Sequence, residues 1–216
     1  MEKSFYTGKG IGVCILDTGI YEHIDFTGRI WAFYDFLAFK RRPYDDNGHG
    51  THVAGLVAGD GTASMGKYRG AAPGCGIIAL KVLDRYGNGS QDDVLRALRW
   101  IREYRQQYRI RVVNISVGTT CNSKRNHARL LESVEQLWDE GVVVVTAAGN
   151  QGPRPGSITA PGSSKKVITV APAICWKGAV LFQGEDQRRN ACASRILWRL
   201  EIRSCPACLE NLILMV

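Results

Sequence analysis

The chain has 216 residues, 45% of them apolar and 24 of them glycine, which fits one globular α/β domain or most of one. No stretch reaches the roughly 18 consecutive apolar residues that a membrane-spanning helix needs, so we expect no membrane partner. The formal net charge of +8 is concentrated in arginines between Arg96 and Arg111, whose spacing of three to four residues predicts a solvated helix face. Because no aromatic platform is recognised between these arginines, we expect no nucleic-acid partner.

The first residues, Met1 to Tyr6, show no basic segment followed by an apolar one. The sequence therefore predicts no signal peptide and a cytoplasmic protein. Seven cysteines are scattered along the chain, and in a reducing compartment we expect no disulfide framework.

The first predicted strand, Ile11 to Leu16, is apolar and ends directly before Asp17. A carboxylate in that position would be partly buried and would need a partner. A histidine N–H is a suitable partner, because the pair fixes the tautomer and stabilises the imidazolium. The alternative is a loop aspartate that caps Thr18 and Gly19.

A turn containing two aspartates leads into a predicted helix that begins near Gly48. His49, at the start of this helix, is expected to project into a cleft, and Gly50 beside it would let a substrate backbone approach. His52, one turn later, is expected to face the interior or the neighbourhood of Asp17. A metal site is disfavoured, because no glutamate lies between the two histidines as in zinc-binding helices.

Strands and helices then alternate to the end of the recognisable pattern. The alternation predicts a parallel sheet covered on both faces, and the carboxyl ends of such strands collect functional groups. Asp17, Ser116 and Asn150 each lie at or just after such an end. The predicted elements are a strand over 77–83, a helix over 91–108 capped by Ser90, a strand over 111–117, a helix over 127–140 closed by Gly141, and strands over 142–146 and 167–170.

Several motifs in this order resemble those of the subtilisin-like (subtilase, peptidase S8) serine endopeptidases, over about residues 6–170. They are Val-Cys-Ile-Leu-Asp17-Thr-Gly, Asp-Asp-Asn-Gly-His49-Gly-Thr-His-Val-Ala-Gly, Gly-Ala-Ala-Pro73, Asn-Ile-Ser116-Val-Gly and Thr-Ala-Ala-Gly-Asn150. The resemblance implies an α/β fold, a parallel-sheet, three-layer sandwich that is incomplete at the C-terminus. It implies that Asp17 orients His49, that His49 is the general base, and that the Asn150 amide stabilises the oxyanion. An ordinary turn asparagine is the alternative for Asn150.

The resemblance also implies protein or peptide substrates and three groups of substrate-binding residues. It implies that no cofactor is required; calcium occurs in the family, but residues 59–70 hold one carboxylate, Asp60, and no site is identified. Two backbone edges would pair with the substrate and one segment would form the wall of a specificity pocket. These groups are Ser116, Val117 and Gly118; Gly87, Asn88 and Gly89; and Ala147, Ala148 and Gly149.

The chain departs from the family pattern after about Phe182. The family's nucleophilic serine lies in Gly-Thr-Ser-Met-Ala, and that pattern is absent. Codons can be chosen for Arg189 to Glu201 that, read one base earlier, encode Glu-Glu-Cys-Val-Cys-Lys-Pro-Asp-Ile-Val-Ala-Pro-Gly, which resembles the family segment that precedes the serine. We therefore predict a partial catalytic domain over 1–181 and a frameshifted, non-homologous tail over 182–216.

Without the serine, the chain as it stands is expected to be inactive as a peptidase. Two alternatives to serine-type proteolysis stay open at this point. One is a non-catalytic remnant that binds extended peptides along Gly87 to Gly89 and Ser116 to Gly118. The other is an unstable product without function.

Overall fold

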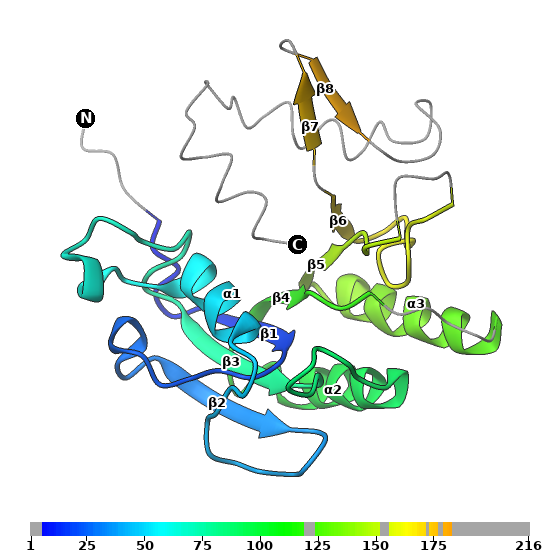
Figure 1. Ribbon diagram of the computed structural model, residues 1–216. Helices are drawn as coiled ribbons and strands as arrows, with labels where there is room; N and C mark the ends of the chain where they lie inside the picture. Colours follow the sequence, from blue (N-terminus) through cyan, green and yellow to red (C-terminus); the bar gives the residue numbers. More distant parts are fainter. Residues whose placement is uncertain (1–5, 119–123, 152–155, 172, 177–178, 183–216) are drawn as a thin grey trace.

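A six-stranded parallel sheet with helices on both faces forms the body of the protein (Figure 1). The computed structural model describes residues 6–118, 124–151, 156–171, 173–176 and 179–182. The strand order is β2-β3-β1-β4-β5-β6, and β7 and β8 form a separate antiparallel pair. The elements are β1 (Gly12–Asp17), η1 (Ile24–Phe26), β2 (Ile30–Asp35), α1 (His49–Ala58), η2 (Thr62–Ser64), β3 (Gly76–Lys81), α2 (Gln91–Tyr104), β4 (Ile110–Ile115), α3 (Lys124–Asp139), β5 (Val143–Ala147), β6 (Ile168–Val170), β7 (Ala173–Trp176) and β8 (Ala179–Phe182).

The two faces of the sheet carry two separate apolar cores. Cys14 and Leu16 of β1 lie in the core shared with α2 and α3, whereas Val13 and Ile15 lie in the core shared with α1. Successive side chains of a strand point to opposite faces, so the continuous apolar run of β1 serves both cores. The predicted parallel sheet with helices on both faces is therefore observed.

On the face of the sheet that packs against α1, strands β4 and β5 are less buried than strands β1 and β3. In the parallel register, Val13 pairs with Val112, and Val112 pairs with Val143, which places these valines on the α1 face. Val143 is 39% exposed, while Val144, which points to the α2–α3 face, is fully buried. The sheet thus has one complete core and one that thins toward β5.

Helix α2 is shorter than predicted. It ends at Tyr104, and a turn rather than a further helical turn leads to β4. The Arg109 backbone adopts a left-handed conformation with φ of +48°, and the Ile110 N–H donates to Arg105 O at 2.8 Å. This closure redirects the chain into the sheet. Strand β2, at the opposite edge from β6, has no counterpart among the predicted elements.

The expectation that no aromatic platform accompanies the arginines between Arg96 and Arg111 is wrong. Trp100 stacks on Tyr104 at 4.6 Å and on Tyr108 at 5.7 Å between ring centroids. The arginines themselves pair with carboxylates: both Arg102 and Arg105 contact Glu140 after α3.

Along the described part of the chain, no helix has the length and hydropathy needed to cross a membrane.

Candidate active site

Asp17 and His49 meet at the carboxyl end of β1. The Asp17 side chain is 1% exposed, and its Oδ1 lies 2.8 Å from His49 Nδ1. Because an ionised carboxylate can only accept, Nδ1 carries the shared proton and Nε2 is the free basic nitrogen. The Thr18 N–H donates to the same Oδ1 at 2.7 Å, whereas Oδ2 is buried with no hydrogen-bond partner among the described residues. The imidazole is thus the main group that can balance the carboxylate charge.

Asp45 fixes the start of α1, and sequence reasoning assigned it no role. Its Oδ1 accepts from the Thr18 hydroxyl at 2.9 Å and from the Gly48 N–H at 2.9 Å. Its Oδ2 accepts from both the N–H and the hydroxyl of Thr51, at 2.9 and 2.6 Å. Burial acts to raise the pKa of Asp45, but the hydrogen bonds from Thr51 and Gly48 outweigh it and lower the pKa. Asp45 therefore stays ionised and ties the residue after Asp17 to the first turn of the His49 helix.

The environment of His49 favours the protonated ring. The hydrogen bond to Asp17 raises the pKa of His49, burial acts in the opposite direction, and the charges of Asp17 and Asp45 add to the increase. Protonation of His49 therefore contributes stability below the ordinary pKa of about 6.5, and this contribution is lost as the pH rises through the higher folded-state pKa.

We predict that Asp17→Asn lowers the pKa of His49, because it removes the strongest cause of the increase. An NMR titration of the imidazole resonances measures the change. Asp17→Asn is also expected to destabilise the protein more at a pH below 6.5 than at alkaline pH. Asp139→Asn, which removes an exposed carboxylate paired with Lys166, is the matched control and should leave the His49 pKa unchanged. An unchanged pKa in Asp17→Asn would contradict the pairing.

Two expectations about the His49 helix are not met. His52 is exposed and does not face the interior or Asp17. Gly50 is buried, and a Cβ there would lie 2.3 Å from Gly19 O and 3.1 Å from the Asp17 Cβ. The absence of a side chain at Gly50 thus admits the protein's own backbone beside Asp17, rather than that of a substrate.

Two of the predicted substrate-binding segments lie side by side. A Cβ on Gly118 would be 3.2 Å from the Gly149 Cα, and both glycines pack against the Thr159 side chain. The Thr159 N–H donates to Ala148 O at 2.9 Å. Val117, Ala147 and Ala148 are buried, and Ser116 accepts from the Asn114 amide at 2.8 Å. Thr159, which no motif indicated, thus joins the predicted edge to the predicted pocket wall.

The third predicted segment, Gly87 to Gly89, is a tight turn closed by Asp84. The Asp84 carboxylate accepts from the Asn88 N–H at 2.9 Å, and the Asp84 N–H donates to Asn88 O at 2.7 Å. Gly87 has φ of +77°, a conformation that favours glycine. Asn150 lies in the loop after β5 with its side chain exposed. Its role as oxyanion donor stays a prediction.

The described residues show no cluster of three or more His, Cys, Asp and Glu side chains suited to a metal ion. Asp60, the one carboxylate considered from the sequence, accepts from the Thr62 N–H at 2.8 Å and pairs with Arg29 at 3.5 Å. Its oxygens are thus engaged by the protein itself.

A buried aspartate that orients a histidine at the carboxyl edge of a parallel sheet is the arrangement of hydrolases that activate a nucleophile through an imidazole. The family model for the Subtilase family (peptidase S8) matches residues 8–180. The chain belongs to the subtilase family. The predicted subtilisin-like α/β fold is confirmed by the solved structures that it resembles.

Similar proteins are serine proteases by name. Serine protease AprX of Bacillus subtilis (strain 168) is 44% identical over 170 residues, which make up 76% of this chain and 38% of AprX. Thermophilic serine proteinase of Bacillus sp. (strain AK1) is 37% identical over 164 residues, 75% of this chain and 38% of the relative. The structure of S41 psychrophilic protease matches with a TM-score of 0.69 at 33% identity, covering 81% of this chain and 57% of that one. The chain thus spans well under half the length of these two curated relatives.

Proposed function

We propose that the Asp17–His49 pair is the acid–base part of a serine endopeptidase site. The observation that carries the proposal is the 2.8 Å contact between His49 Nδ1 and the buried Asp17 carboxylate. It leaves Nε2 free to take a proton from a serine hydroxyl and return it to the leaving amine. The subtilase family membership and the names of the relatives support the same reaction, with protein or peptide substrates.

In this proposal the remaining residues bind substrate and stabilise charge, and no cofactor takes part. Gly118 would present backbone to an extended peptide, and Gly149, which lies beside it, would form part of the wall of the specificity pocket. The Asn150 amide would donate to the oxyanion that forms when the carbonyl is attacked.

We also propose that this polypeptide does not carry out the reaction by itself, because the Gly-Thr-Ser-Met-Ala pattern that bears the family's serine is absent from its 216 residues. Subtilase similarity ends at residue 180, close to where the alternative reading frame begins to resemble the family. Apart from Phe182, the proposed tail lies outside the described residues. Sequencing of the coding DNA from codon 175 to beyond codon 216 tests the frameshift directly.

A fluorophosphonate probe, which labels activated serines covalently, tests the function. We expect no labelling of the purified chain and strong labelling of a second chain translated in the alternative frame from about codon 182. His49→Ala in the second chain is the control and should abolish labelling. Labelling of the present chain at any serine would refute its proposed inactivity, and failure of a folded, frame-restored chain to react would refute the proposed peptidase site.

A further inference from the structure

Lys81, the last residue of β3, is a buried cation next to the candidate active site. It is 1% exposed, and its Cα pairs with that of Asp17 in the parallel register of β3 and β1. Fully buried lysines are rare, because removing an ammonium from water is costly unless its protons are bound by the protein. The contacts of this side chain must therefore compensate for its burial.

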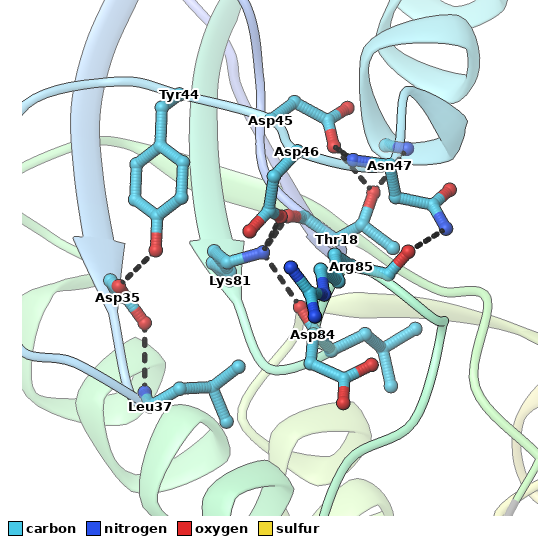
Figure 2. Close-up of polar contacts among 12 residues, drawn as sticks. Thr18, Asp35, Leu37, Tyr44, Asp45, Asp46, Asn47, Lys81, Asp84 and Arg85 are labelled. Carbon is cyan, nitrogen blue, oxygen red and sulfur yellow. Dashed lines mark hydrogen bonds and ion pairs between the residues drawn. The ribbon is translucent and has the colours of Figure 1, made fainter.

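Three oxygens satisfy the three protons of the Lys81 ammonium (Figure 2). Nζ donates to Thr18 O at 2.5 Å, to Asp46 Oδ1 at 2.7 Å and to Leu83 O at 2.9 Å. The ring of Tyr44 lies 5.1 Å from Nζ and adds a cation–π contact. A satisfied, buried ammonium of this kind has one geometry, so it holds its three acceptors at fixed positions relative to one another.

These acceptors come from the three segments that surround the Asp17–His49 pair. Thr18 directly follows Asp17 and donates its N–H to Asp17 Oδ1. Asp46 lies beside Asp45, whose carboxylate binds the first turn of α1. Leu83 donates its own N–H to Asp17 O at 3.2 Å. The ammonium therefore links the end of the aspartate strand to the loop that leads into the histidine helix.

We propose that Lys81 is a positioning residue for the Asp17–His49 pair, holding the carboxyl end of β1 against the loop before α1 so that Oδ1 stays within hydrogen-bond distance of Nδ1. Its meaning for catalysis rests on the proposed peptidase function, but the positioning itself can be measured without any hydrolysis.

The measurement must separate positioning from charge. Lys81 is surrounded by Asp46, Asp84 and Tyr44, and His49 by Asp17 and Asp45. Removing the lysine charge shifts the His49 pKa through space whether or not the pair is well aligned. The measured quantity is therefore the decrease in the His49 pKa that Asp17→Asn causes, determined once in chains that contain Lys81 and once in chains that lack it. The direct effect of the lysine charge is the same in both chains of each pair, so it largely cancels when the two decreases are compared.

The test is a cycle of four full-length chains: wild type, Asp17→Asn, Lys81→Met and the double variant, with the His49 resonances followed by NMR titration. We expect Lys81→Met to reduce the pKa decrease caused by Asp17→Asn by about half or more. An undiminished decrease in folded Lys81→Met would overturn the proposal, because it would show that Lys81 serves only the stability of the fold.

Asp46→Asn provides a second variant, since Lys81→Met leaves two buried carbonyls without their donor. The Asp46 side chain is 44% exposed, so its replacement should leave the protein folded. We expect Asp46→Asn to reduce the Asp17-dependent pKa decrease as well, by a smaller amount, and no reduction would count against the proposal. Lys166→Met, at an exposed lysine paired with Asp139, is the control. The frame-restored chain can react with the phosphonate probe while the Asp17-dependent pKa decrease is the same with and without Lys81. That result would refute the positioning role of Lys81 and leave the proposed peptidase function intact.

Discussion

In a chain translated through the alternative reading frame from about codon 182, His49→Ala is expected to lower kcat for peptide hydrolysis by about 10⁶-fold. This is the size of the effect reported for the corresponding histidine of subtilisin, a family member, and it reflects the loss of the base that makes a serine nucleophilic. Initial rates on a chromogenic peptide, with the enzyme titrated for folded protein, provide the measurement.

Asp17→Asn in the same chain should cost less, about 10⁴-fold, because the base remains but its tautomer and its imidazolium lose their support. His52→Ala is a matched control: it removes an exposed imidazole from the same helix, one turn away. We expect it to leave kcat within a fewfold of the parent. A His49→Ala chain that retains most of its activity would mean that another group acts as the base.

The sequence was sufficient to predict the parts of the fold in which local pattern and tertiary role coincide. The run from Val13 to Leu16 is apolar because it is buried on both faces of a parallel sheet. Strand β2 was not predicted, because an edge strand is buried on fewer sides and its sequence, Ile-Trp-Ala-Phe-Tyr-Asp, shows no clean period. The end of α2 was placed four residues late, because apolar and charged residues continue at helical spacing into a turn, which the Ile110 N–H closes by donating to Arg105 O.

Residues of the candidate site could be predicted from the sequence only where they lie in a short, recognisable motif. Asp17 and His49 could be paired from the sequence, since each lies in a specific motif. Lys81 could not be linked to them, because its acceptors on Thr18 and Asp46 lie 63 and 35 residues away. Thr159 was missed for the same reason: nothing local marks a threonine that packs against Gly118 and Gly149.

Two glycines of helix α1 differ in whether the fold requires them. Gly50 and Gly55 lie on the same helix, and neither has a positive φ. A Cβ at Gly50 would meet backbone, at 2.3 Å from Gly19 O and 3.0 Å from Gly19 N, whereas one at Gly55 would meet nothing within 4 Å. Gly50 is therefore required by close packing, while Gly55 leaves the helix with unused conformational freedom.

We therefore predict that the same substitution has opposite signs at the two positions. Gly50→Ala should destabilise the protein by about 1–3 kcal/mol, because a backbone contact of this kind is relieved only by moving α1 away from β1. Gly55→Ala should stabilise it by about 0.5–1 kcal/mol, through better helix propensity and a less flexible unfolded chain. Urea unfolding of both variants measures the difference.

The His49 titration adds a second readout that separates packing from site geometry. In Gly50→Ala the displaced helix start should lengthen the Asp17–His49 hydrogen bond, so the pKa of His49 should fall toward its ordinary value of about 6.5. In Gly55→Ala it should not move. If Gly50→Ala were as stable as the parent and kept the raised pKa, the approach of α1 to Gly19 would not be what holds His49 against Asp17, and the contacts of Asp45 and Lys81 would have to suffice.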